Sequence, residues 1–347
     1  MKRAIFSLPI LFLFMFSGCV NHNINAAKKE GPANGYSSCF PTENASVQIE
    51  TVTRSVKKVY SVSSYTTYQF KRDAHITGYH LQQGNYKKAS WGVVSTNETV
   101  FGSATIIGNA DSRVALLTCA HIVISPDTLI SYFEPTDGDP SRYIQSISIK
   151  EKQENWVKEI SSCGTFRVLA SDVSSDIAIL GKNCESLTDT VIPFPYLTGH
   201  ARNLAWGSFV YVFGYPLGSQ AVTTGIVSLA PKRPMGEFSI DALLNKGYSG
   251  GIILAIRSGM SNFELTGMVK TVNSTREEFL KPSSDQQRSP DWLPYTGELF
   301  VGRSDNIQYG LNAVVPIESI IGFYKKNREE LISAGYNLDN FFRYEQP

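Results

Sequence analysis

Short apolar runs, rich in β-branched residues and separated by Gly, Asn, Asp and Pro, recur through most of the chain. Runs of this length and spacing predict β-strands. In the first half the predicted strands are Trp91–Val94, Ser103–Ile107, Arg113–Thr118, Ser146–Ile149, Phe166–Ala170 and Ile177–Leu180. In the second half they are Phe209–Phe213, Ala221–Leu229, Phe238–Ile240, Ile252–Ile256, Leu265–Val272 and Leu311–Ile317. Many short strands in this arrangement indicate an all-β fold of barrels or a sandwich.

The segments around these strands have other patterns. The tyrosine-rich stretch Thr51–Phe70 predicts one or two strands, within an N-terminal β extension over residues 51–90. Ser125–Tyr143 and Thr275–Tyr309 are polar and contain prolines, so we expect a loop excursion and a long surface insertion. Apolar residues at helical spacing over Glu318–Ala334 predict a closing helix.

The amino terminus has the pattern of an export signal. Met1–Arg3 is positively charged, Ala4–Phe16 is almost wholly apolar, and small residues lead to Cys19. The apolar stretch is too short to span a bilayer comfortably, which favours a signal over residues 1–18. Its ending resembles a bacterial lipoprotein signal, in which Cys19 is lipidated and holds the protein on the periplasmic side of a membrane. Ordinary cleavage between Gly18 and Ala27 is the alternative.

Composition sets the size of the core and narrows the partners. The chain has 347 residues, 42% of them hydrophobic, and can therefore bury one large β domain or two packed barrels. A net charge of +1 gives no electrostatic case for a nucleic-acid partner or an acidic substrate. Residues 19–50 are poor in apolar side chains and are expected to form a flexible tether.

Export to an oxidising compartment would allow disulfides among the cysteines that follow the signal. Cys163 and Cys184 flank a predicted hairpin and are candidates for a cross-strand pair. Cys39 and Cys119 either pair or stay free. None of the four has metal-ligand spacing with a histidine, so no metal site is expected.

Three separate segments carry a candidate catalytic site. Ser249 lies in the turn Gly247–Gly251, where glycines let the backbone bend sharply and direct its amides to one place. His121 follows the end of a predicted strand, and Asp176 opens another. A hydroxyl, an imidazole and a carboxylate are the groups that acyl transfer by an activated serine requires. Asp172 is the competing carboxylate, and capping of a turn is the competing role for Asp176.

Several segments together resemble a trypsin-like serine peptidase, nearest to the bacterial HtrA/Deg branch. The resemblance covers roughly Phe101–Tyr324. The segments that carry it are Gly102–Ile107, Thr118–Val123, Ser175–Leu180, Gly214–Gly218 with Val222–Ser228, Asp241–Ala242 ahead of Gly247–Gly251, and Ala313–Ile317. Agreement in separate segments is far more specific than one motif.

The resemblance implies two packed antiparallel β-barrels of the chymotrypsin type with a C-terminal helix. The peptidase domain is expected over residues 91–325, with the first barrel at about 91–200 and the second at about 205–318. Residues 318–347 are expected to hold the helix and a tail. This leaves no room for the PDZ domain of typical HtrA proteins.

The resemblance also implies roles for the site residues. Ser249 would attack a peptide carbonyl, His121 would remove the proton of Ser249, and Asp176 would orient the imidazole. The oxyanion hole is expected in the stretch Gly247, Tyr248 and Ser249, through the amides of the first and last. This mechanism calls for no cofactor.

Substrate contacts are expected on both sides of the serine turn. Leu243 resembles the base of the specificity pocket, where an apolar residue favours aliphatic or aromatic side chains, although a plain core position is an equal alternative. Val269, Lys270 and Thr271 resemble the strand that pairs with an extended peptide.

Two functions stay open at this point. The first is an exported, lipid-anchored serine endopeptidase that cleaves polypeptides. Tyr248 stands where the family usually carries Asn or Asp, so the second is a catalytically impaired scaffold that binds peptides or proteins. An esterase is disfavoured because no α/β alternation surrounds the serine.

Overall fold

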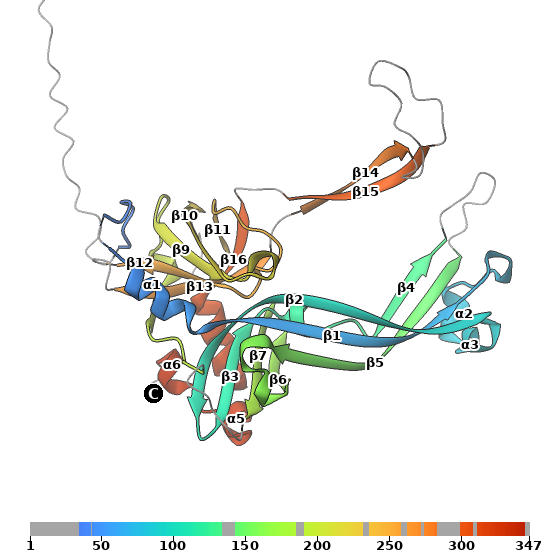
Figure 1. The fold of residues 1–347 in the computed structure, drawn as a ribbon, viewed down its shortest axis with the longest axis horizontal. Coiled ribbons are helices and arrows are strands. Elements are labelled where there is room, and N and C mark those ends of the chain that lie inside the picture. Colours follow the sequence, from blue (N-terminus) through green and yellow to red (C-terminus); the bar gives the residue numbers. More distant parts are fainter. Residues whose placement is uncertain are drawn as a thin grey trace, which may run out of the picture. The chain divides into compact units, whose positions relative to one another are not determined.

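Two six-stranded antiparallel β-barrels and a C-terminal helix make up the fold, which confirms the predicted fold class (Figure 1). The computed structural model describes residues 35–42, 44–133, 143–184, 191–231, 236–257, 262–271, 274–282, 299–307 and 311–343, with the backbone alone from 271 to 307. The export signal and Cys19 lie outside the described residues.

The first barrel closes where β1 pairs with β5, the first and fifth strands along the chain. In barrel order its strands are β1 (Val56–Gln69), β2 (Gly92–Ala110), β3 (Arg113–Thr118), β7 (Ile177–Asn183), β6 (Thr165–Asp172) and β5 (Ile144–Val157). A further strand, β4 (Thr128–Tyr132), pairs with β5 outside the closed ring. The stretch Ser125–Tyr143 is therefore not wholly a loop, because its backbone pairs with β5.

The second barrel closes through pairing of β12 with β13. In barrel order its strands are β12 (Ile252–Ile256), β9 (Phe209–Gly214), β10 (Ala221–Leu229), β11 (Phe238–Ile240), β16 (Asn312–Pro316) and β13 (Phe263–Thr271). A short strand, β8 (Leu197–Thr198), runs parallel to β13. Within the predicted insertion, β14 (Ser274–Pro282) and β15 (Leu299–Ile307) form an antiparallel pair of their own.

The N-terminal region differs from its prediction. Thr51–Phe70 does not form a separate β extension, because β1 pairs along its whole length with β2 and is the strand that closes the first barrel. Trp91–Val94 and Ser103–Ile107 belong to one strand, β2. The outer part of this strand, residues 95–99, is polar and exposed, which made the sequence appear to turn there. The first barrel therefore begins at Val56, well before residue 91.

The predicted tether is wrong for the part of residues 19–50 that the structure describes. Tyr36 is buried, and the Ser37 amide donates to the Ile256 carbonyl at 2.8 Å. The helix α1 (Ser46–Thr53) then leads directly into β1. Backbone hydrogen bonds and aromatic burial hold this segment on the second barrel, although its composition is polar.

Most of the short helical turns lie between strands, and the long helix α5 follows the last strand and is itself followed by a short turn. The short turns are η1 (Arg72–Ala74), α2 (Gly78–Gln82), α3 (Tyr86–Ala89), α4 (Ala120–Val123), η2 (Lys158–Cys163), η3 (Ala201–Asn203), η4 (Pro216–Gly218) and α6 (Asp339–Phe342). The long helix α5 (Ile317–Ser333) buries Ile317, Ile320, Phe323, Tyr324 and Leu331, a spacing of one helical face. None of the described helices is long and apolar enough to cross a membrane.

The end of α5 is set by a glycine. Gly335 has a φ of +89°, its amide donates to the Ile332 carbonyl, and the Tyr336 amide donates to the Leu331 carbonyl, each at 2.8 Å. These two bonds are those of a Schellman cap, which requires a left-handed residue. The sequence therefore stops the helix at this point.

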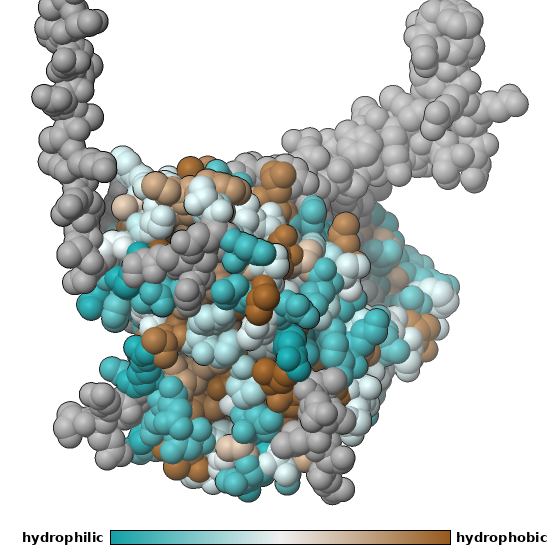
Figure 2. Space-filling model, turned by 60° about the vertical axis from the view of Figure 1, so that its left-hand side comes forward, coloured by the Kyte–Doolittle hydropathy of each residue, from teal (hydrophilic) through white to brown (hydrophobic). Residues whose placement is uncertain are grey.

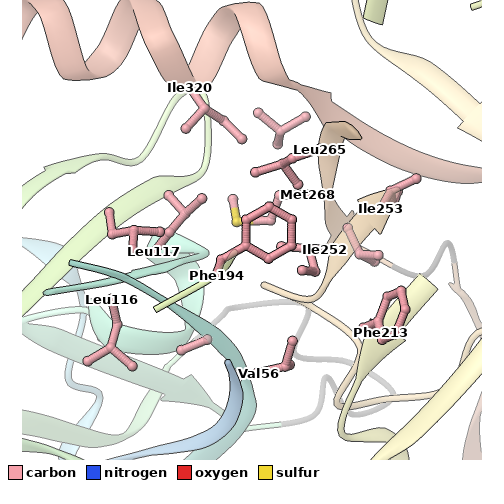
Figure 3. Close-up of a cluster of buried hydrophobic side chains, with 14 of the residues drawn as sticks. Val56, Leu116, Leu117, Phe194, Phe213, Ile252, Ile253, Leu265, Met268 and Ile320 are labelled. Carbon is pink, nitrogen blue, oxygen red and sulfur yellow. The ribbon is translucent and has the colours of Figure 1, made fainter. Parts of the chain in front are cut away.

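One hydrophobic core runs through both barrels. Figure 3 shows side chains from the first barrel (Leu116, Leu117), the second (Ile252, Met268) and α5 (Ile320) gathered in one cluster. Burial of each such side chain contributes about 1.5–3 kcal/mol. On the outside, hydrophilic residues cover most of the coloured surface and hydrophobic ones form small separate patches (Figure 2).

The cysteines divide into a bonded pair and two free thiols. Cys163, in η2, and Cys184, just after β7, form a disulfide with their Cα atoms 4.9 Å apart. Cys39 is free and exposed, and Cys119 is free and buried. The disulfide links the two ends of the β6–β7 hairpin, the hairpin that carries Asp176.

Candidate active site

His121 projects from a single helical turn that follows β3. Its neighbours Ala120, Ile122 and Val123 are buried and anchor the turn, and the Ile124 amide closes it on the Ala120 carbonyl at 2.8 Å. The side chain of His121 is 44% exposed. Alternation of buried and exposed positions in one turn thus presents the imidazole to solvent on an immobile base.

Asp176 lies in the turn between β6 and β7 and holds His121 twice. Its Oδ2 is 2.8 Å from the imidazole Nδ1, and its Oδ1 accepts the His121 backbone N–H at 2.9 Å. The residue has a φ of +58°, a left-handed conformation that Asp tolerates better than most residues. Strain of this kind is typical of positions that the surrounding structure fixes for a purpose.

The bond to Asp176 determines the state of the imidazole. An ionised carboxylate can only accept hydrogen bonds, so Nδ1 carries the proton of this bond, and in a neutral ring of this tautomer Nε2 is the nitrogen that can accept a proton. Asp172, the competing carboxylate, instead accepts from the Ser174 amide at 2.9 Å and from the Ser174 hydroxyl at 2.6 Å. Asp172 therefore caps the turn, while Asp176 contacts the histidine.

The serine turn is attached to the first barrel through Ser103 of β2. The Ser103 amide donates to the Ser249 carbonyl at 2.8 Å, and the Ser103 hydroxyl donates to the Gly247 carbonyl at 2.7 Å. The Ser103 carbonyl accepts from the Thr118 hydroxyl at 2.7 Å, three residues before His121. One fully buried serine thus connects the turn of Ser249 with the strand that leads to His121.

Close packing makes glycine necessary directly after Ser249. Gly250 has a φ of +79°, and a Cβ there would lie 2.6 Å from the Thr118 hydroxyl and closer still to the Ser103 carbonyl. The Gly250 amide donates to the Val269 carbonyl at 2.9 Å. Any side chain at this position would push the two barrels apart beside Ser249.

Two backbone amides of the turn are left available to a ligand. Among the described residues, the amides of Gly247 and Ser249 donate to no other group. The Lys246 carbonyl is held by the Leu217 amide at 2.9 Å, and the Tyr248 carbonyl by the Gly251 amide at 2.7 Å. The C=O and N–H of a trans peptide point in opposite directions. With the Lys246 and Tyr248 carbonyls held by Leu217 and Gly251, the N–H groups of Gly247 and Ser249 therefore point away from those two residues.

The structure does not complete the row of three side chains. Within the described residues, no hydrogen bond joins the hydroxyl of Ser249 to the ring of His121. Ser249 is half-buried, and its attachment to Ser103 and the attachment of Thr118 to Ser103 bring the two turns to the same seam. Such contacts are often long in the absence of substrate and shorten when it binds.

Cys119 packs behind this site as a protonated thiol. It donates to the Val269 carbonyl at 3.2 Å, the same carbonyl that accepts from Gly250. Burial, and next the charge of Asp176, raise the pKa of Cys119 well above its usual value. Potential ligand atoms of Cys119, His121 and Asp176 lie within 4.8 Å of one another, and the Asp176 carboxylate already binds the His121 ring and backbone.

Tyr248 turns inward instead of covering the serine. It is 3% exposed, and a Cβ on Gly214 of β9 would lie 2.7 Å from its ring. Burial raises the pKa of its hydroxyl. The missing side chain at Gly214 thus makes room for the aromatic ring beside the nucleophile position.

The predicted substrate-contacting residues fall into different environments. Leu243 is 66% exposed between two buried neighbours, so the alternative that it belongs to the core is wrong. Val269 is fully buried and offers only its backbone. Lys270 pairs with Glu237 at 2.6 Å, and the side chain of Thr271 lies outside the described part. Pairing of β13 with β12 ends at Met268, ahead of this stretch.

Sequence reasoning missed the residues that support the turn. In the sequence, Ser103 is the first residue of a predicted strand, and Leu217, which has a φ of +51°, lies in the motif segment Gly214–Gly218. Ser103 contacts Ser249, more than a hundred positions away, and Leu217 contacts Lys246, about thirty positions away. Contacts between segments so far apart leave no local signature in the sequence.

Comparison with known proteins agrees with the architecture. Residues 102–260 match the family model described as a trypsin-like peptidase domain. The matched stretch contains His121, Asp176 and Ser249. No curated protein matches the chain.

Proposed function

Because the chain contains a trypsin-like peptidase domain built from two six-stranded barrels, we propose that it is a serine endopeptidase that acts on polypeptides. Ser249 is the nucleophile, His121 the general base and Asp176 the residue that orients and stabilises the imidazole. The amides of Gly247 and Ser249 form the oxyanion hole.

The reaction follows from these roles. Nε2 of His121 takes the hydroxyl proton as the Ser249 oxygen bonds to the scissile carbonyl carbon, and the two amides stabilise the negative charge on the carbonyl oxygen. The imidazolium then protonates the leaving amine as the C–N bond breaks. Water, deprotonated by the same imidazole, releases the acyl group and restores the serine.

One observation carries the proposal: an Asp176–His121 hydrogen-bonded pair occurs together with a serine turn in which two anchored backbone amides, those of Gly247 and Ser249, have no partner among the described residues. Preorganised donors of this kind typically contribute about 3 kcal/mol each to the transition state. The pair supplies a base in the required tautomer, and the turn supplies a place for charge to develop.

A fluorophosphonate probe tests this function directly. We expect stoichiometric labelling of the full chain, complete loss in Ser249→Ala, and unchanged labelling in Ser90→Ala, a partly exposed serine far from the site in sequence. Folded protein that resists the probe would support a second candidate, a peptide-binding scaffold. The absence of a direct Ser249–His121 hydrogen bond in the described residues is what keeps that candidate open.

We also propose, from the amino-terminal sequence, that the enzyme is exported and lipid-anchored at Cys19 on the periplasmic side of a bacterial membrane, and from the motif segments that it is nearest to the HtrA/Deg branch. Incorporation of labelled palmitate that disappears in Cys19→Ser is the expected result. Incorporation that survives this substitution, or release of the parent protein as an unmodified soluble chain, contradicts the anchor.

A further inference from the structure

A polar cavity of about 410 Å³ lies on the second barrel at the end of β12 and β13 remote from Ser249. Arg257 follows β12 and Glu264 is the second residue of β13, whereas Ser249 precedes β12. The cavity lining includes Thr198, His200, Glu264, Arg202, Arg257 and Arg343. Three arginines from three separate segments thus meet around one hollow.

One side of the cavity is a rigid hydrogen-bonded wall. Arg257 binds Glu264 through two bonds, Nε to Oε1 at 2.7 Å and a terminal guanidinium nitrogen to Oε2 at 2.9 Å. Tyr36 donates to Oε2 of the same carboxylate at 2.6 Å and accepts the His200 N–H at 2.8 Å. Burial opposes the charge of Glu264, but the bonds from Arg257 and Tyr36 outweigh it and lower its pKa.

The other side of the cavity consists of the exposed guanidinium groups of Arg202 and Arg343. Arg202, in η3, and Arg343, just after α6, are exposed, and in the part of the chain that the structure describes neither guanidinium has a hydrogen bond or ion pair. The nearest further carboxylate, Glu318, accepts the Arg202 backbone N–H at 3.2 Å. The three arginines carry three positive charges, and Glu264 and Glu318 carry two negative ones. His200 also lies in the cavity lining.

We propose that this cavity binds a phosphoryl group, from free phosphate or from a phospholipid headgroup. Guanidinium forks match phosphate oxygens, and donors from several directions suit a tetrahedral group better than a planar carboxylate with two oxygens. Arg257 is already oriented by Glu264 and Tyr36, so little of its side-chain freedom is lost on binding. Arg202 and Arg343 have no counter-ion among the residues that the structure describes, and a bound anion would supply one.

A phospholipid headgroup is one of the two sources because Cys19, which we propose to be lipidated, precedes the wall residue Tyr36 by 17 residues. This short separation in sequence is the reason to test the headgroup beside free phosphate.

Titration of the full chain with inorganic phosphate at low ionic strength, followed by calorimetry, tests the site. We expect saturable binding with a Kd of about 1 mM or tighter. The double variant Arg202→Gln/Arg343→Gln should weaken it by about tenfold or more. The matched control Arg54→Gln, an exposed arginine on another element, should stay within about twofold. No saturable binding, or equal affinity in the double variant, overturns the proposal.

Vesicles of phosphatidylcholine with and without phosphatidic acid distinguish the two sources. Binding that increases with phosphatidic acid and falls in the double variant, but not in Arg54→Gln, identifies the headgroup. Phosphate binding that depends on the arginines without such vesicle binding identifies free phosphate. Both variants should unfold at the parent temperature, because all three substituted arginines are exposed. Binding is the readout throughout, so this result is independent of fluorophosphonate labelling.

Discussion

The two halves of the candidate active site are held in place by different kinds of bond. In the first barrel, the Asp176 carboxylate fixes His121 by two hydrogen bonds, to the ring at 2.8 Å and to the backbone N–H at 2.9 Å. In the second barrel, the turn around Ser249 is fixed by backbone carbonyls that accept from Leu217, Gly251 and Ser103. The first half therefore depends on the charge of one carboxylate, and the second on neutral groups and on small residues.

This difference lets the chemistry of the histidine base be tested separately from the geometry of the oxyanion hole. Removing the charge of Asp176 should disable the base without disturbing the turn. Removing a support of the turn should misplace the oxyanion hole without changing the base. Substitutions in each half are therefore expected to differ in which kinetic constant they change and in how much stability they cost.

The largest effect is expected from Asp176→Asn. An amide in place of the carboxylate favours the wrong imidazole tautomer, so kcat should fall by about 10⁴. Because the side chain keeps its size, the unfolding temperature should change little. Steady-state kinetics on a peptide substrate, with thermal unfolding as the control, measures both. A fall of less than about tenfold would contradict the role of Asp176.

Ser103→Ala is expected to have the next largest effect, and in the other half of the site. It leaves the Gly247 carbonyl and the Tyr215 amide, which donates to the Ser103 hydroxyl at 2.9 Å, without a partner. We expect a loss of about 1–3 kcal/mol in the free energy of unfolding and a fall in kcat of about 10².

Ser63→Ala is the matched control for this prediction. Ser63 is a buried serine on β1 that donates to the Ser125 hydroxyl at 2.8 Å, away from the turn. It should cost similar stability, measured by urea unfolding, with kcat unchanged. Equal kcat values in Ser103→Ala and the parent would show that the turn does not need this support.

How far the sequence predicts the fold depends on burial. Strands with alternating or fully apolar patterns, such as β3 and β9, and the helical period of α5 were predicted close to their bounds. The start of the first barrel was missed, because the outer part of β2 is polar on both faces and its pairing with β1 has no local signal. Burial of Tyr36 was likewise invisible in a polar segment.

The same limit applies to the site. Short motifs around His121 and Asp176 were enough to predict a pair that the structure brings together. The anchors Ser103 and Leu217 were not predicted, because their role consists of backbone contacts with segments distant in sequence. Motifs thus identify groups that react, while the groups that hold them emerge only from strand register and packing.

The smallest effect is expected from Asp172→Asn. Asp172 and Asp176 lie at the two ends of the turn between β6 and β7, so this variant compares two carboxylates of the same turn. Bonds from Ser174 and Ser175 lower the pKa of Asp172 to about 2, below its unfolded value of about 3.9. A lowered pKa means that the ionised form adds stability above about pH 4, and that this stability is lost as pH falls toward 2. Solvent screening limits it to a few tenths of a kcal/mol. Urea midpoints of parent and variant should differ slightly at pH 7 and converge as pH falls to about 2, and kcat should stay within about twofold. A fall in kcat like that of Asp176→Asn would mean that the two aspartates do not divide turn capping and histidine orientation between them.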